Sequence, residues 1–308
     1  FLLLSLIFSS SINIHIYDDG SLLFQHHLPI RPLPPPLCYG ATIHFWGPPR
    51  AATSKPQLLL IHGFGPQSVW QWRQQISFFA RDFDVYVPDL VFFGDSFTKS
   101  PQRSEVFQAT CLVKLLEKLG IRSYSIVGTS YGGFVAYRMA AMWPERVEKV
   151  VIASSAVNMR PGDNERLLKK ANVEKIEDLM MPASAQQLRK LLDLVVFRRP
   201  YIPDFFLNDL IDKLYSENRK EKLELLKGLS IGQSQDPTLT IPPLSQEVLI
   251  VWGEHDQIFL LERGIELKTI VGGEKARLQV IKNTSHLPQL EQPAHFNTIL
   301  HDFLHDLS

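Results

Sequence analysis

Cysteine is scarce in this chain, which has only two among its 308 residues, Cys38 and Cys111. Neither belongs to a Cys-x-x-Cys pair or to a Cys/His cluster, so the sequence offers no zinc site and no disulfide framework. In a chain of this size we expect two separate buried thiols rather than one disulfide. A hydrophobic core must then hold the fold, and hydrophobic residues make up 45% of the chain.

A net charge is missing as well, because 32 Lys and Arg residues balance 32 Asp and Glu residues. Nucleic acids and anionic membrane surfaces attract proteins through excess positive charge. The composition therefore predicts no nucleic-acid partner and favours a neutral small-molecule substrate. It leaves the choice between a monomer and a homodimer open.

Long apolar runs are also absent, since no stretch after the N-terminus approaches the 18 residues that a membrane-spanning helix needs. The body of the protein is therefore expected to be soluble. Residues 1–9 are apolar but too short to span a bilayer. They fit the remnant of a signal segment, a truncated anchor, or the point where the sequence was cut.

The first 56 residues form an irregular region. Two β-like runs, Ser11–Tyr17 and Leu22–His26, flank the turn residues Asp18-Asp19-Gly20 and predict a hairpin. Pro29–Pro36 contains five prolines, which exclude a helix or a central strand and predict an extended linker. Ala41–Trp46 is expected to be another short strand.

From residue 57 onward, short apolar runs alternate with helical periodicity, which indicates βα units and a parallel sheet. Nearly continuous apolar strands are typical of sheets that are buried on both faces. The expected strands are Leu58–Ile61, Val85–Pro88, Tyr124–Gly128, Val147–Ala153, Val248–Trp252 and Arg277–Ile281. The expected helices are Val69–Arg81, Ser104–Leu119, Gly133–Met142, Leu260–Ile270 and Pro293–Leu307.

This alternation stops between residues 158 and 240, where helical patterns follow one another without a strand. We expect helices at Leu167–Asn172, Val173–Met181, Ala185–Phe197 and Phe205–Leu226. Ligands bind at the carboxyl edge of open α/β sheets. A helical block inserted between two strands is therefore interpreted as a lid over that edge.

The strongest chemical signal is Gly-x-Ser-x-Gly around Ser130, directly after an expected strand and before an expected helix. A serine at such a strand-to-helix turn has its hydroxyl raised into the cleft, and small residues at Gly128 and Gly132 allow close backbone packing. Ser130 is the predicted nucleophile. The alternative is a glycine-rich turn with an exposed serine.

A serine needs a base to remove its proton and a carboxylate to orient that base. Among ten histidines, His286 follows the last expected strand and is the predicted base, whereas His295, His301 and His305 fall on the terminal helix. Asp256, at the end of the preceding strand, is the predicted acid. The alternatives are Glu254 and Asp163, and His255 is expected to be a surface residue.

An acyl-transfer site also needs N–H donors for the oxyanion. The glycine-rich turn after Leu58–Ile61 and the residue after the nucleophile supply the backbone N–H groups of Phe64 and Tyr131. His62 is expected to be a hydrogen-bonded structural residue. Two further carboxylates, Asp89 and Asp95, are expected to hold loops.

Apolar side chains in the helical block allow two interpretations. They pack the lid helices onto the body, or they form either an apolar wall for an acyl chain or ring or a face that touches lipid. The residues concerned are Leu191, Leu192, Val195, Val196, Phe197, Phe205, Phe206 and Leu207.

Residues 57–308 resemble the α/β-hydrolase superfamily, in which matching motifs occur in the same order. The motifs are His62–Gly65, Pro88–Leu90 with Phe93–Ser96, Gly128–Gly132, Trp252–Asp256, and the His286 loop with Glu291–Pro293. The chain looks most similar to plant α/β-hydrolase or epoxide-hydrolase-like proteins, to monoacylglycerol lipases and to carbon–carbon-bond hydrolases. True epoxide hydrolases carry Asp at the nucleophile position, so Ser130 disfavours that chemistry. Ser285 stands where many relatives have glycine before the histidine.

The resemblance implies an eight-stranded, mostly parallel sheet flanked by helices, with an inserted helical lid. It divides the chain into an N-terminal extension (1–56), a core (57–157 and 241–308) and a lid (158–240). It also implies hydrolysis of an ester or related acyl or carbon–carbon bond without metal or organic cofactor. The alternative that stays open is a ligand receptor on the same fold with slow or no turnover. Membrane contact through the lid or the N-terminus stays open too.

Overall fold

A ten-stranded sheet runs through the described part of the chain, which comprises residues 14–16, 22–29, 40–48, 55–65, 67–231 and 241–306 of this computed structural model. The strand order is β1-β2-β3-β5-β4-β7-β8-β9-β10, and β6 pairs with β3. The strands are β1 (Ile14–Ile16), β2 (Leu22–Pro29), β3 (Ala41–Gly47), β4 (Gln57–Ile61), β5 (Asp84–Pro88), β6 (Phe97–Thr98), β7 (Tyr124–Thr129), β8 (Val147–Ala153), β9 (Glu247–Gly253) and β10 (Ala276–Ile281).

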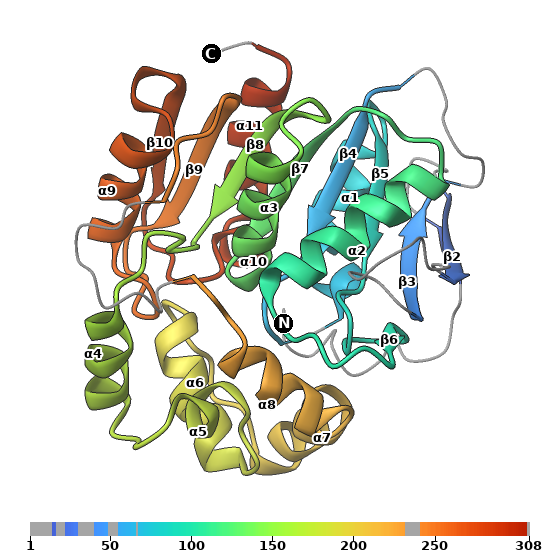
Figure 1. The fold of residues 1–308 in the computed structure, drawn as a ribbon. Coiled ribbons are helices and arrows are strands. Elements are labelled where there is room, and N and C mark those ends of the chain that lie inside the picture. The colour runs from blue at the N-terminus through green and yellow to red at the C-terminus, as the bar shows by residue number, and fades with distance from the viewer. Residues whose placement is uncertain are drawn as a thin grey trace.

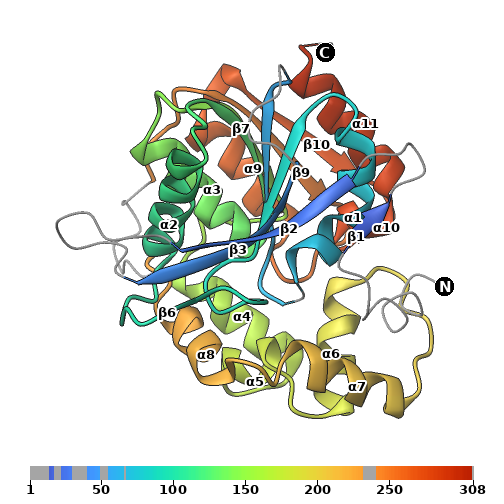
Figure 2. The ribbon, with the colours of Figure 1, turned by 90° about the vertical axis from the view of Figure 1, so that its right-hand side faces the viewer.

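Along the sheet, the neighbouring strands β5, β4, β7, β8, β9 and β10 pair in parallel. At the other edge, β1 pairs antiparallel with β2, β2 with β3, and β3 with β5. Eight strands have five residues or more, and β1 and β6 are short. The structure therefore confirms the mostly parallel eight-stranded sheet and adds two short strands. Figure 2 shows β2 and β3 running steeply across the direction of β4, as the twist of a sheet produces.

The two faces of the sheet are both covered by helices because successive strand residues point to opposite faces. In β4, Leu58 and Leu60 face a core built with α1 (Ser68–Phe79) and α11 (Pro293–Leu304). Leu59 and Ile61 face the other core, where α2 (Glu105–Lys118), α3 (Tyr131–Met142) and α9 (Leu261–Val271) pack (Figure 1). Each buried side chain of this size contributes about 1.5–3 kcal/mol, so these two layers supply most of the stabilisation.

Between β8 and β9, the described residues form five helices, which contribute most of a third apolar core. They are α4 (Pro161–Ala171), α5 (Ile176–Met180), α6 (Ala185–Val195), α7 (Asp204–Leu214) and α8 (Arg219–Lys227). In both views they lie together below the ends at which the parallel strands terminate (Figures 1 and 2). This is the carboxyl edge of the sheet, where the sequence analysis predicted the inserted helical block.

The first of these helices begins six residues before the predicted start at Leu167. Pro161 occupies its first turn, where a missing N–H costs nothing. The carboxylate of Asp163 accepts a hydrogen bond from the backbone N–H of Arg160 at 2.9 Å. These two local signals start α4 at Pro161.

The prediction of one helix over Phe205–Leu226 is wrong, because α7 and α8 are separate helices. Between them, Asn218 adopts the left-handed conformation with φ 50°, which ends the helical path. Its side-chain amide donates to the carbonyl of Phe92 at 3.3 Å. A contact with the body therefore accompanies the break.

The N-terminal strands agree with the prediction where the structure describes them, since β1 and β2 pair antiparallel. The expected turn Asp18–Gly20, most of the proline run and Cys38 lie outside the described residues. Cys111 is buried in α2. The sequence did not predict β6, α10 (Pro288–Glu291) or the short 3-10 helix Gly273–Lys275. Among the described residues, every helix is too short or too polar to cross a bilayer.

Candidate active site

The predicted nucleophile Ser130 stands at a sharp turn between β7 and α3. Its backbone has φ 51° and ψ −122°, a strained conformation for a residue with a side chain. A Cβ atom at Gly128 would lie 2.3 Å from the carbonyl oxygen of Gly132, and one at Gly132 would lie 2.3 Å from that of Ile61. Only glycine fits at both positions, so the sequence Gly-x-Ser-x-Gly is what permits this turn.

The structure brings the three predicted residues into one hydrogen-bonded chain. The Oγ atom of Ser130 lies 2.9 Å from Nε2 of His286, and Nδ1 of His286 lies 2.9 Å from Oδ2 of Asp256. All three side chains are buried, with Ser130 the most accessible at 9%. The loops that carry them lie 30 and 156 residues apart in sequence and meet at the carboxyl edge of the sheet.

The surroundings of Asp256 fix the direction of the hydrogen bonds. Its Oδ1 atom accepts from the N–H groups of Ile258 at 2.9 Å and Phe259 at 3.0 Å. Oδ2 remains available for the N–H at Nδ1 of His286. Nε2 of His286 is then an acceptor for the hydroxyl of Ser130, which is the arrangement that a general base requires.

The two backbone N–H groups expected to stabilise an oxyanion flank the nucleophile. Tyr131 follows Ser130 at the first position of α3, and Phe64 lies in the turn after β4 and lines the same cavity as Ser130. By contrast, the N–H of Ser130 donates to Ala153 at 2.9 Å and that of Gly63 donates to Gln71 at 2.7 Å. Within the described residues, the backbone N–H groups of Phe64 and Tyr131 have no hydrogen-bond acceptor. They remain the two donors proposed for the oxyanion.

The structure adds Glu291, whose role the sequence did not predict. Its carboxylate accepts from the N–H of Ser285 and from that of Phe197, each at 2.7 Å. Burial raises the pKa of this carboxyl above its usual range. Glu291 thus joins the residue before His286 to the segment that follows α6 in the helical block. The signal in the sequence was an acidic residue five positions after the histidine.

The neighbouring His62 is structural, as the sequence indicated. It is fully buried, its Nδ1 lies 2.7 Å from the carbonyl of Gly63, and its Nε2 accepts from the N–H of Leu90 at 2.9 Å. Burial lowers the pKa of His62 below its usual value of 6.5. The imidazole is therefore neutral and holds the turn that carries Phe64.

The carboxylate of Asp89 holds loops, as expected. It accepts from the N–H of Ser68 at 2.9 Å, and its other oxygen lies 2.5 Å from Nδ1 of His44. Burial acts to raise the pKa of Asp89, but the hydrogen bond and charge of His44, the charge of His62 and the hydrogen bond from Ser68 together outweigh it, and the pKa lies below its usual range. Asp95 is exposed.

The alternative acids lie away from His286. Asp163 lies in the first turn of α4, and its carboxylate oxygen Oδ2 lies 3.0 Å from Nε of Arg263. Glu254 accepts from the N–H of Asn283 at 3.3 Å and lies 3.3 Å from Nε2 of His255. His255 is at the surface, where it stacks on Phe197 with ring centroids 4.5 Å apart.

A cavity of about 220 Å³ opens beside Ser130 and His286. Most of its lining is apolar and comes from the helical block and from the turns after β4 and β10. The apolar lining residues are Phe64, Trp70, Met180, Leu188, Leu191, Leu192, Val195, Val196, Pro200, Leu210, Leu214, Tyr215, Leu287 and Leu290. Besides the catalytic candidates, the lining includes Gln71, Arg73 and Glu291.

The apolar side chains of the helical block fall into three groups by position. Leu191, Leu192, Val195 and Val196 line the cavity, whereas Leu207 is fully buried in the core of the block. Outside the cavity, Phe205 is 65% exposed and stacks on Phe206.

The family model described as alpha/beta hydrolase fold matches residues 56–293. The match covers well over half of the chain, and the mostly parallel sheet flanked by helices agrees with it. The protein therefore belongs to the α/β hydrolase fold family, and its class is that of a hydrolase.

Curated relatives are similar over most of their length. A 2-hydroxy-6-oxononadienedioate/2-hydroxy-6-oxononatrienedioate hydrolase of Paraburkholderia phymatum is 27% identical over 259 residues, which cover 81% of this chain and 87% of the relative. The Escherichia coli enzyme of the same name is 25% identical, over 80% and 86% of the two chains.

Solved structures show the same fold. The 2-hydroxy-6-oxo-6-phenylhexa-2,4-dienoate hydrolase of a Rhodococcus species superposes with a TM-score of 0.71 at 23% identity, over 92% of this chain and 99% of that one. A thermophilic esterase from Thermogutta terrifontis superposes with a TM-score of 0.66 at 21% identity, over 92% and 98%. At these identities the likeness supports the fold alone.

Proposed function

We propose that this protein is a serine hydrolase that cleaves an ester or related acyl bond of a small, largely apolar substrate through an acyl-enzyme. The observation that carries the proposal is the hydrogen-bonded chain from Ser130 through His286 to Asp256, which opens into an apolar cavity. Residues 158–240 act as the lid of this site, and residues 57–157 with 241–308 form the catalytic core.

The reaction follows from the direction of the hydrogen bonds. His286 removes the hydroxyl proton of Ser130, whose oxygen forms a bond to the substrate carbonyl carbon. The N–H groups of Phe64 and Tyr131 stabilise the resulting oxyanion. His286 then gives its proton to the leaving group as the bond to the carbonyl carbon breaks. Water repeats the sequence and releases the acid, so no metal or organic cofactor enters the reaction.

The decisive test is Ser130→Ala with a panel of p-nitrophenyl esters of increasing acyl length. We expect turnover to fall by at least about 10⁴-fold while the fold stays intact, because Ser130 is the one hydroxyl among the described residues that is hydrogen-bonded to His286. Labelling by a fluorophosphonate should map to Ser130 and vanish in the variant. Unchanged hydrolysis by Ser130→Ala would end the proposal. A ligand-induced rise in Tm with no turnover in the parent protein would favour a receptor.

A second candidate reaction is hydrolysis of a carbon–carbon bond beside a ketone in a substrate that carries a carboxylate. The curated relatives are named as hydrolases of 2-hydroxy-6-oxononadienedioate and 2-hydroxy-6-oxononatrienedioate, and these names describe compounds with a ketone and two carboxylates. Arg73 supports it here: among the described residues it is the one Lys or Arg in the cavity lining, and it forms no ion pair with a described carboxylate. Its guanidinium lies 4.2 Å from the ring of Trp70, and burial lowers its pKa. A substrate carboxylate would supply the missing counter-charge.

Arg73→Gln, with Arg73→Lys as the control that keeps the charge, separates the two reactions. For a 2-hydroxy-6-oxo-dienoate, we expect Arg73→Gln to lower kcat/KM about 10- to 100-fold, because a hydrogen bond to a charged group is lost. Arg73→Lys should lose less, and a neutral ester should change much less than the dienoate. An equal loss of kcat/KM on both substrates would show that Arg73 does not bind the substrate carboxylate.

A further inference from the structure

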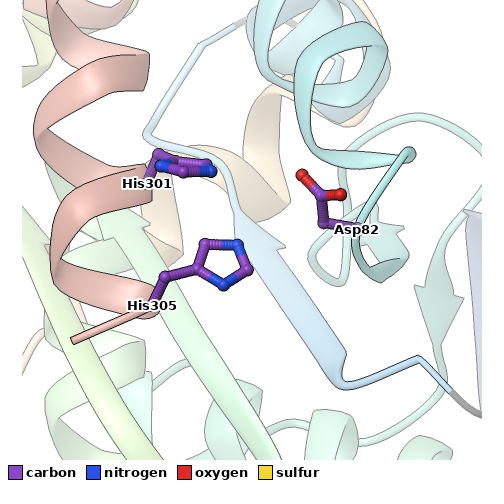
Figure 3. Close-up of side chains that lie close together, drawn as sticks. All are labelled: Asp82, His301 and His305. Carbon is purple, nitrogen blue, oxygen red and sulfur yellow. The ribbon is translucent and has the colours of Figure 1, made fainter. Parts of the chain in front are cut away.

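A second group of titratable side chains lies far from the catalytic site, at the opposite edge of the sheet. It consists of Asp82, in the turn between α1 and β5, of His301 in the last turn of α11, and of His305, the residue that directly follows this helix (Figure 3). The parallel strands run from this edge toward Ser130, since β5 begins two residues after Asp82 whereas Ser130 follows the end of β7. The sequence alone indicated only ordinary helix histidines here.

Each of the three residues offers one ligand atom, and these atoms lie within 4.8 Å of one another. The histidines are four positions apart, and the backbone N–H of His305 donates to the carbonyl of His301 at 3.0 Å, so His305 continues the last helical turn and lies on the same face as His301. Figure 3 shows the carboxylate of Asp82 facing the two rings across a gap. Ligand atoms 2.0–2.1 Å from a tetrahedral metal ion are about 3.4 Å apart, so small side-chain rotations complete the site.

Packing holds the two imidazoles in place. The ring of His301 contacts that of Phe78 edge-on at 6.0 Å, and the ring of His305 lies 5.2 Å from that of Phe83. The two imidazoles lie 4.4 Å apart. Both phenylalanines belong to α1 or the turn after it, so the segment that carries Asp82 also orients the histidines. Less side-chain freedom is then lost when an ion binds.

Asp82 is fixed through its backbone and available through its side chain. Its N–H and that of Phe83 both donate to the carbonyl of Phe79, at 3.1 and 2.9 Å. Within the described part of the chain, its carboxylate makes no hydrogen bond or ion pair. Asp302 lies 3.6 Å from Nδ1 of His301. A carboxylate there favours the proton on Nδ1 and leaves Nε2 as the ligand.

We propose that Asp82, His301 and His305 form a binding site for a first-row divalent transition metal ion such as Zn²⁺. Two imidazoles and one carboxylate are borderline ligands that suit Zn²⁺, Co²⁺, Ni²⁺ or Cu²⁺, whereas Mg²⁺ and Ca²⁺ prefer oxygen ligands. The ion ties the C-terminal helix to the α1–β5 turn. It stabilises the fold because the unfolded chain does not hold the three ligands together.

The test is titration of the untagged full chain with Zn²⁺ by calorimetry, and with Co²⁺ by visible absorption. The variants are Asp82→Asn, His301→Gln and His305→Gln, and the matched control is His295→Gln, an exposed histidine on the same helix. We expect one tight site, weakened more than about 10-fold in each cluster variant and unchanged in the control. Zn²⁺ should raise Tm in the parent and the control but not in His305→Gln.

Ester hydrolysis should be the same with Zn²⁺ and after treatment with a chelator, because the cluster lies at the other edge of the sheet from Ser130. Asp82→Asn is exposed and nearly isosteric, so it keeps the test valid if a histidine variant folds poorly. Absence of a tight site in the parent would overturn the proposal. So would a site that survives in all three cluster variants.

Discussion

At the scale of single residues, this site depends on strain and on hydrogen-bond direction. Ser130 holds a backbone conformation that costs energy, and the packing of Gly128 and Gly132 against their neighbours keeps it there. Asp256 uses both carboxylate oxygens, one for two backbone N–H groups and one for His286. The proposed activity of His286 therefore depends on which nitrogen carries its proton.

Asp256→Asn tests this dependence. An amide at this position can present its NH₂ to Nδ1, which moves the imidazole proton to Nε2 and removes the acceptor for Ser130. We expect kcat to fall about 10⁴-fold with little change in Tm. Steady-state kinetics with thermal melts of both proteins measures this. A loss of less than tenfold would mean that the carboxylate does not control the tautomer.

At the scale of elements, the helical block meets the body through a few defined contacts. Glu291 joins the His286 loop to the end of α6 through the N–H of Phe197, and Asn218 joins the α7–α8 break to the carbonyl of Phe92. The block also supplies much of the apolar cavity wall. Its position on the body therefore decides the shape of the site.

The break at Asn218 gives a stability prediction with an internal control. Asn218→Ala should lower the free energy of unfolding by about 1–2 kcal/mol, because a Cβ-bearing residue without a polar side chain is disfavoured at φ 50°. Asn218→Gly loses the same hydrogen bond to Phe92 but no conformational preference, so it should remain close to the parent. Urea denaturation of the three proteins gives the comparison. Equal losses in both variants would assign the effect to the side-chain contact instead.

At the scale of the whole molecule, helices bury both faces of the sheet, and the imidazole of His62 is buried with them. This burial lowers the pKa of His62 below 6.5. Below pH 6.5 the unfolded chain protonates this histidine while the folded protein keeps it neutral. The unfolded state then binds more protons, so the free energy of unfolding falls as the pH falls.

The effect is measured by comparing the parent with His62→Asn at pH 7.5 and 5.5. Although the variant is less stable at pH 7.5, we expect it to lose less stability on acidification, by up to about 1.4 kcal/mol per pH unit. Chemical denaturation at both pH values gives the double difference, in which the other histidines cancel. An identical acid-induced loss in the two proteins would contradict the assignment.

Prediction from the sequence succeeded where local pattern and local chemistry coincide. Apolar runs located the strands from Leu58 onward because strands buried on both faces need apolar side chains throughout. Prediction of the helix over Phe205–Leu226 failed at Asn218, because a single left-handed residue does not disturb the apolar periodicity of the sequence. The sequence prediction started α4 too late because the apolar pattern begins after the capping residues. The role of Glu291 was invisible because both of its partners lie on other segments.

The sequence by itself determined the α/β class, the strained turn at Ser130 and the candidates Asp256 and His286, because each follows from short-range pattern and strand order. Only the tertiary structure decided which oxygen of Asp256 faces the histidine, that Arg73 enters the cavity, and that Asp82 lies beside His301 and His305. These facts join segments that are far apart in the sequence. Near the cluster, for example, the side chain of Asn297 on α11 donates to the carbonyl of Gln74 on α1, across 223 residues of sequence. Such contacts depend on how helices pack across a sheet face, which no local pattern encodes.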